Sequence, residues 1–108
     1  MRPEALRGHL DLLLLAVLEA APAHGYLIIE RLRAASDGAF DLPEGTVYPA
    51  LHRLERRGLL ESSWDDSSGR RRRVYALTDR GRAALRAHRA EWHGFAAAVG
   101  RVAGGARA

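Results

Sequence analysis

The 108-residue chain contains no cysteine, which excludes a disulfide framework and any thiolate metal site. A protein without disulfides fits a reducing compartment. No hydrophobic run is long enough to cross a bilayer, because the apolar stretch from Leu12 to Leu18 is bracketed by Asp11 and Glu19. A signal peptide is not expected, since acidic residues precede this stretch where basic ones are usual. The sequence therefore predicts a cytoplasmic protein that does not bind membranes.

Lysine is also absent, so all 17 basic residues are arginine, against 13 acidic ones, for a net charge of +4. The planar guanidinium group suits two-pronged contacts with phosphate and guanine better than an ammonium group does. Hydrophobic residues make up 47% of the chain, which is enough for a packed core. A chain of this length is expected to form one domain with one appended element.

Apolar residues recur at intervals of three and four in three segments, each of which predicts a helix. The first segment carries a stripe of Leu6, Leu10, Leu13, Leu14, Val17 and Leu18, which leaves Leu12 and Leu15 off the stripe. The second runs from about residue 24 to stop signals at residues 36–38, with Tyr26, Ile28, Ile29 and Leu32 expected inward. Residues 40–42 follow as a connector with at most a single extended pair.

The third helix is predicted from Glu44 to Arg57, with a core face of Val47, Ala50, Leu51 and Leu54. Pro49 must lie in or near its first turn, or else kink it. Residues 59–64 and 71–77 predict a β-hairpin around the turn at 65–69, and Thr78 is a suitable N-cap for a last helix.

Three helices, a hairpin and a long helix make a mainly α fold with a small β-hairpin, the winged helix-turn-helix, plus a C-terminal dimerisation helix. We expect residues 1–78 to form the DNA-binding domain, 79–103 the dimerisation helix and 104–108 a flexible tail.

The third helix and the hairpin carry the candidate DNA contacts. The outward face of the helix combines small residues, an aromatic hydroxyl and guanidinium groups, which suit phosphate and base edges; the candidates are Thr46, Tyr48, Pro49, His52, Arg53 and Arg56. Arg70, Arg71, Arg72 and Arg73 follow the hairpin turn and need counter-charge, such as a phosphate backbone. The alternatives are a solvated helix face and a charged strand edge that blocks aggregation.

The last helix carries the heptad seam of a coiled coil, formed by Leu85, His88, Trp92, Phe95, Val99 and Val102. A helix this long extends beyond the domain, so its far half needs a partner, and a homodimer matches a palindromic site. The alternative is packing against the chain's own first helix. Trp92 and Phe95 are candidates to line a site for a small aromatic effector, although aromatic residues at this spacing are more often core.

Several motifs together resemble the short form of the PadR family of transcriptional regulators, over about residues 6–85. They are His24-Gly25-Tyr26, the run 45–51 (GTVYPAL), 53–55 (RLE), 58–60 (GLL), Gly69-Arg70, Tyr75 and 77–81 (LTDRG). The resemblance implies DNA contact by Tyr48 with its helix and by the wing residues Arg70, Arg72 and Arg73. Pro43 and Glu44 depart from the family pattern, as does the excess of wing arginine.

The sequence thus predicts a homodimeric, sequence-specific DNA-binding regulator, a repressor at an inverted-repeat operator in double-stranded DNA that a small molecule could release. The alternative is a winged-helix adaptor that binds proteins and no DNA. We expect neither an enzyme nor any metal or cofactor, because the five histidines are scattered and no catalytic constellation is present.

Overall fold

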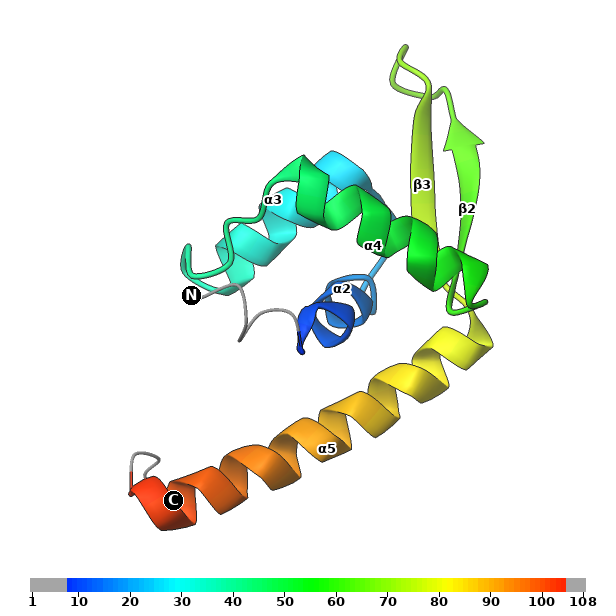
Figure 1. Ribbon diagram of the computed structural model, residues 1–108. Helices are drawn as coiled ribbons and strands as arrows, with labels where there is room; N and C mark the ends of the chain where they lie inside the picture. The colour runs from blue at the N-terminus through cyan, green and yellow to red at the C-terminus, as the bar shows by residue number, and fades with distance from the viewer. Residues whose placement is uncertain (1–7, 105–108) are drawn as a thin grey trace.

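The computed structural model describes residues 8–104 and is mainly α-helical with a small antiparallel sheet, as predicted (Figure 1). Its elements are α2 (Leu10–Val17), β1 (Ala23–His24), α3 (Gly25–Ala35), α4 (Glu44–Arg56), β2 (Leu60–Asp65), β3 (Arg72–Leu77) and α5 (Asp79–Ala103). Leu6 and residues 105–108 of the expected tail lie outside the described part. None of the described helices is both long and apolar enough to span a membrane.

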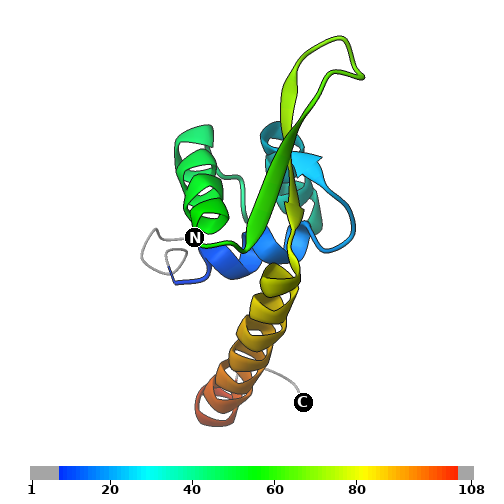
Figure 2. The ribbon, with the colours of Figure 1, turned by 90° about the vertical axis from the view of Figure 1, so that its right-hand side faces the viewer.

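Three helices surround the core while the hairpin and the last helix project from it in different directions. α3 and α4 pack on α2, the β2–β3 hairpin rises beside them, and α5 runs away from the base of the hairpin (Figures 1 and 2). The core takes side chains from every helix and from the sheet, including Leu14, Ile28, Leu51, Tyr75 and Leu85. The near half of α5 therefore belongs to the domain, and its far half extends beyond it.

A third strand, β1, was not predicted from the sequence. Ala23 pairs with Tyr75 and His24 with Val74, so the sheet has the order β1-β3-β2. The connector at 40–42 is irregular and forms no extended pair. β1 leads directly into α3, so the sheet fixes the start of α3 against the wing.

Two expected side-chain positions were wrong. Leu15 is completely buried although it lies off the predicted stripe of α2, because α3, α4 and α5 all pack against this helix. Tyr26 was expected inward, yet 60% of it is exposed, because it lies in the first turn of α3 at the rim of the domain. The predicted core face of α4 is confirmed: Val47, Ala50, Leu51 and Leu54 are all buried.

Pro49 lies inside α4, in the second turn rather than the first. Its ring nitrogen has no hydrogen to donate to the carbonyl of Gly45, four residues earlier. Both residues are exposed, so water can satisfy that carbonyl. Pro43, the N-cap residue, has extended backbone and offers no side-chain cap. The start of α4 is thus set by tertiary packing rather than by a cap.

The joint between the wing and α5 is built from backbone and one hydroxyl. Thr78 Oγ1 donates to the carbonyl of Gly58 at 2.7 Å and accepts from the Gly81 N–H at 3.0 Å, which confirms Thr78 as the N-cap. The Thr78 N–H donates to the Leu59 carbonyl at 3.2 Å. A Cβ on Gly81 would overlap that same carbonyl oxygen. Only glycine permits α5 to start so close to the first residues of the wing.

Candidate nucleic-acid interface

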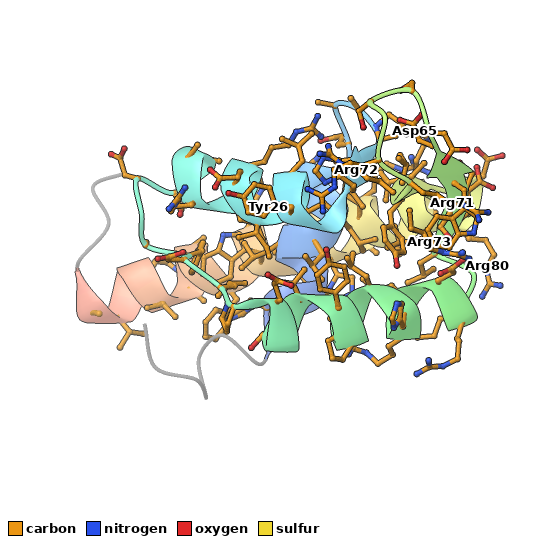
Figure 3. All side chains as sticks on the ribbon, turned by 90° about the horizontal axis from the view of Figure 1, so that it is seen from above. Tyr26, Asp65, Arg71, Arg72, Arg73 and Arg80 are labelled. Atoms are coloured by element: carbon orange, nitrogen blue, oxygen red, sulfur yellow. The ribbon has the colours of Figure 1, made fainter. Side chains whose placement is uncertain are left out.

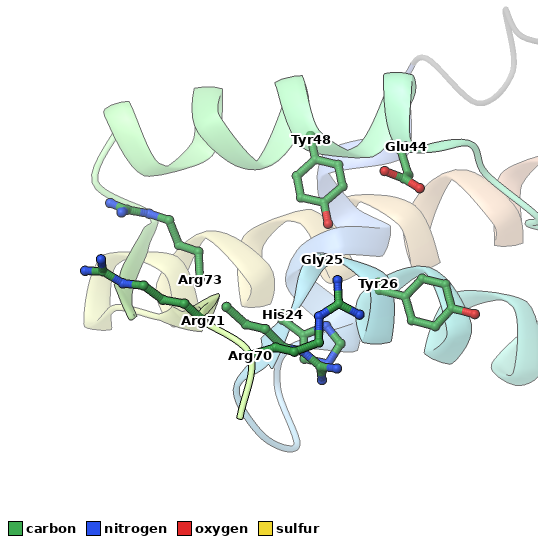
Figure 4. A pocket seen from close by; sticks show the side chains of 9 residues that line it. His24, Gly25, Tyr26, Glu44, Tyr48, Arg70, Arg71 and Arg73 are labelled. Carbon is green, nitrogen blue, oxygen red and sulfur yellow. The ribbon is translucent and has the colours of Figure 1, made fainter. Parts of the chain in front are cut away.

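A groove separates the wing from the N-terminal ends of α3 and α4. Its volume is about 450 Å³, and it is open to solvent (Figure 4). The lining residues are His24, Gly25, Tyr26, Glu44, Tyr48, Arg70, Arg71, Arg72 and Arg73. The structure thus brings five of the predicted DNA-contacting residues, Tyr48 and the four wing arginines, to one surface.

Tyr48 joins α4 to α3 at the floor of this groove. Its half-buried ring lies over Gly25, where a Cβ would overlap the ring carbons and hydroxyl (Figure 4). This close approach explains why glycine follows His24 in the His-Gly-Tyr motif. Tyr48 therefore faces the groove with its hydroxyl end while its ring positions the two helices.

The remaining predicted contacts on α4 lie outside the groove. Pro49, His52, Arg53 and Arg56 are exposed, and Thr46 is half-buried. In the free protein Arg53 forms an ion pair with Asp11 of α2, and the Arg57 guanidinium lies 3.3 Å from the second carboxylate oxygen of Asp11. Arg53 is therefore held against α2 rather than directed outward.

The wing arginines divide between the two faces of the hairpin, as strand alternation predicts. The guanidinium groups of Arg71 and Arg73 lie 4.5 Å and 5.1 Å from the ring centroid of Trp64, in cation–π contact. Arg73 also donates to Ser62 Oγ at 2.8 Å and lies 3.7 Å from a carboxylate oxygen of Glu55. Seen from above, Arg71 and Arg73 lie toward α4 (Figure 3).

Arg72 points the other way, toward α3, and its Nη1 lies 3.0 Å from His24 Nε2 (Figure 3). Asp65, at the end of β2, accepts from the Ser67 N–H at 2.9 Å. That backbone hydrogen bond, more than the nearby Arg72, lowers the pKa of Asp65. Asp65 therefore stays ionised and provides a local counter-charge to the basic wing.

The sequence analysis missed His24, Gly25, Tyr26 and Glu44 as groove residues. His24 is the N-cap of α3, where its Nδ1 accepts from the Leu27 N–H at 3.3 Å. The His-Gly-Tyr motif was noticed only as the start of a helix. Its place beside the wing depends on β1, which two residues of sequence do not reveal.

A second cavity, of about 220 Å³, lies between the start of α2 and the middle of α5. Trp92 and Phe95 line it, and the His9 and Trp92 rings meet in a T-shaped arrangement with centroids 5.0 Å apart. The two candidate effector residues are thus brought together with His9, which the sequence analysis did not select.

The apolar seam of α5 is only partly where it was predicted. Leu85 is 2% exposed and packs in the chain's own core, so its place in a dimer seam is corrected. Phe95 and Val102 are 60% and 91% exposed, and Trp92 and Val99 are also exposed. His88 is half-buried beside them. The unpartnered apolar stripe therefore begins after the first two turns of α5.

Within residues 8–104, no three His, Asp or Glu side chains gather as a metal-binding group. The described part of the chain shows no buried side-chain nitrogen or oxygen without a hydrogen-bond partner. No polar or charged residue of the described part is buried, so its charged side chains all reach the surface.

Comparison with known proteins identifies the family. The profile described as the transcriptional regulator PadR-like family matches residues 14–87. A transcriptional regulator of Mycobacterium tuberculosis is 47% identical over 62 residues, which cover 57% of this chain and 55% of the relative. A PadR family transcriptional regulator from Eggerthella lenta has a TM-score of 0.79 and 35% identity, with 95% of this chain and 88% of that chain covered.

A PadR family transcription regulator from Clostridium difficile has a TM-score of 0.78 and 33% identity, and the match covers 88% of this chain and 98% of that chain. The matched profile includes the whole groove and the first turns of α5, and the structural matches also extend over the wing and the long helix. The chain therefore belongs to the PadR-like family of DNA-binding transcriptional regulators, which are not enzymes.

Proposed function

We propose that the chain represses transcription by binding double-stranded DNA as a homodimer at an inverted-repeat operator. The observation that carries this proposal is the groove in which four wing arginines lie beside the start of α4. α4 enters the major groove, and the wing contacts the flanking phosphates. Family membership supports DNA binding. The homodimer, the inverted-repeat operator and repression are proposed from the geometry and charge of this chain.

The two halves of the surface have different tasks. Arg70, Arg71, Arg72 and Arg73 neutralise phosphates, which gives affinity without sequence preference. Thr46, Tyr48, Pro49, His52, Arg53 and Arg56 lie on α4, where they approach base edges or the nearest phosphates. Arg53 exchanges its ion pair with Asp11 for a contact with DNA.

The exposed far half of α5 supports the homodimer. Trp92, Phe95, Val99 and Val102 form an apolar stripe on one side of the helix, and a second copy covers it. Residues 1–78 then act as the DNA-binding unit and residues 79–103 as the dimerisation helix, before the tail at 104–108. A two-fold dimer places two α4 helices about 34 Å apart, in successive major grooves.

The cavity beside Trp92 is the proposed effector site. Its aromatic walls, formed by His9, Trp92 and Phe95, suit a small aromatic molecule. Such a molecule lies between α2 and α5, close to the proposed dimer interface, and its binding releases the operator.

The test is duplex binding measured against salt, followed by footprinting on the DNA upstream of the protein's own gene. Replacing Arg72 and Arg73 by Ala weakens binding to every sequence and flattens the slope of log K against log salt by about 0.9 per lost phosphate contact. The control replaces Arg86 and Arg101 by Ala, because both are exposed on α5 away from its apolar stripe.

A slope that falls in the wing variant but not in the control supports the proposal. An unchanged slope in the wing variant contradicts a phosphate contact by the wing. No duplex binding even at low salt favours the protein-binding adaptor. A footprint without an inverted repeat contradicts the two-fold dimer on DNA.

A further inference from the structure

His24 lies between two hydrogen-bond donors and can satisfy only one of them. Its Nδ1 accepts from the Leu27 N–H at 3.3 Å, and its Nε2 lies 3.0 Å from Nη1 of Arg72. A neutral imidazole has one nitrogen that accepts and one that donates, while a guanidinium group only donates. If Nδ1 caps α3, Nε2 carries the hydrogen and faces another donor.

The two donors, Nε2–H of His24 and the guanidinium group of Arg72, converge in an open groove, where a hydrogen-bond acceptor would satisfy both. The groove beside them is about 450 Å³, and Arg70 and Arg71 add positive charge to its walls. A phosphate oxygen there accepts from Nε2–H of His24 and from Arg72 together, so the two donors no longer face each other. When His24 takes up a proton, the proton goes to Nδ1, which then no longer accepts from the Leu27 N–H. That N–H lies in the first turn of α3, where water can satisfy it.

We propose that His24 and Arg72 form a shared phosphate subsite in this groove, and that His24 takes up a proton when a DNA phosphate occupies it. The inference rests on the proposed function, since the phosphate is that of the DNA backbone. It assigns a DNA contact to α3 in addition to those of α4 and the wing.

The charged and titratable groups around His24 determine the direction of this effect. Burial lowers the pKa of His24 from its usual value of 6.5, and the nearby Arg72 and Arg31 lower it further, against a smaller opposing contribution from Asp65. The other groups of this kind around it are Tyr26 on α3, Glu44 and Tyr48 on α4, and Arg70 and Arg71 on the wing. In the free protein His24 is therefore neutral at neutral pH.

A phosphate bound between His24 and Arg72 reverses that balance, because a negative charge in hydrogen-bond contact favours the imidazolium. The bound state has the higher pKa, so binding takes up protons between the two pKa values. DNA affinity then rises as pH falls through that interval, with a slope of at most about one proton per protomer.

The experiment measures the affinity of the full-length protein for a fluorescein-labelled duplex of mixed sequence, from about pH 8 to about pH 6, at constant salt. The test variant is His24→Asn. Asparagine is a good N-cap and keeps an acceptor for the Leu27 N–H, but it cannot take up a proton. The control is His93→Gln, which removes an exposed histidine on α5 that lies outside the groove.

We expect wild-type protein and His93→Gln to bind several-fold more tightly at the lower pH, while His24→Asn loses that gain. A second measurement needs no variant to fold: in NMR titrations of wild-type protein, the pKa of His24 rises when the duplex is added.

Equal pH dependence in wild-type protein and His24→Asn overturns the subsite, as does a His24 pKa that does not rise with DNA. Either result leaves DNA binding itself intact. By contrast, wild-type protein that binds no duplex at any pH refutes the proposed function, so the two failures are distinct.

Discussion

Asp11 holds Arg53 of α4 and Arg57, the C-cap residue of that helix, against α2, and Asp11→Asn tests what that restraint does. The carboxylate contacts Arg53 and lies 3.3 Å from Arg57, whose side chains are 44% and 54% exposed. Exposed ion pairs contribute about 0.2–1 kcal/mol each, so the variant, which loses two of them, should lose about 0.4–2 kcal/mol of unfolding free energy. Its fold should therefore survive.

DNA binding should respond in the opposite direction. Released from Asp11, Arg53 can reach a phosphate or a base edge without first breaking an ion pair. We expect tighter binding to duplexes of mixed sequence, by a factor of up to about five, because an exposed ion pair of up to about 1 kcal/mol no longer has to be broken. Fluorescence anisotropy measures the affinity of both proteins.

Two further variants separate this explanation from a simple change in net charge. Glu19→Gln removes one carboxylate from another ion pair, in which Glu19 lies 2.9 Å from Arg89 of α5, and it should leave the affinity for DNA nearly unchanged. In an Arg53→Ala background, Asp11→Asn should bring little gain. An equal gain with and without Arg53, or an equal gain in Glu19→Gln, would refute the restraint.

Three more predictions concern the scaffold. Trp92→Glu places a carboxylate in the proposed dimer interface at a cost of about 3–5 kcal/mol, so sedimentation should show monomers at micromolar concentration, and a stable dimer would contradict the seam. Gly81→Ala should lower the unfolding free energy by about 1–3 kcal/mol through overlap with the Leu59 carbonyl. Gly94→Ala, in open space on the same helix, should raise it by about 0.5–1 kcal/mol, and equal signs in urea titrations would refute the steric argument. Because folding lowers the pKa of His24, stability should decline as pH falls below about 6.5, and His24→Asn should lessen that decline in thermal melts.

The parts of the fold that follow a local period could be predicted from the sequence. The core face of α4 depends on spacings of three and four, and the hairpin on alternation around a polar turn. β1 has two residues, which is too short for any period to be visible, and its strand geometry comes from pairing with Val74 and Tyr75. A search of the sequence for local patterns therefore misses β1.

The sequence could not predict which surface covers each apolar residue. Periodicity shows which side of a helix a residue faces, but it does not show what packs against that side. Leu85 and Phe95 share the seam of α5, yet the first is buried by its own chain and the second is exposed. Similarly, Arg53 is exposed on α4, yet its ion pair with Asp11 joins residues 42 positions apart. No local pattern reports such a contact.

The joint at Thr78 ties the base of the wing closely to the first turn of α5, so a rigid-body rotation about it would move both together. Its hydrogen bonds run through backbone groups and a short hydroxyl side chain, so few rotatable bonds lie between the base of the hairpin and the first turn of the helix. A helix of 25 residues is about 37 Å long. One degree of rotation at the joint therefore moves the far end of α5 by about 0.6 Å, and conversely a shift of that size at the far end turns the arginine-bearing strand by one degree.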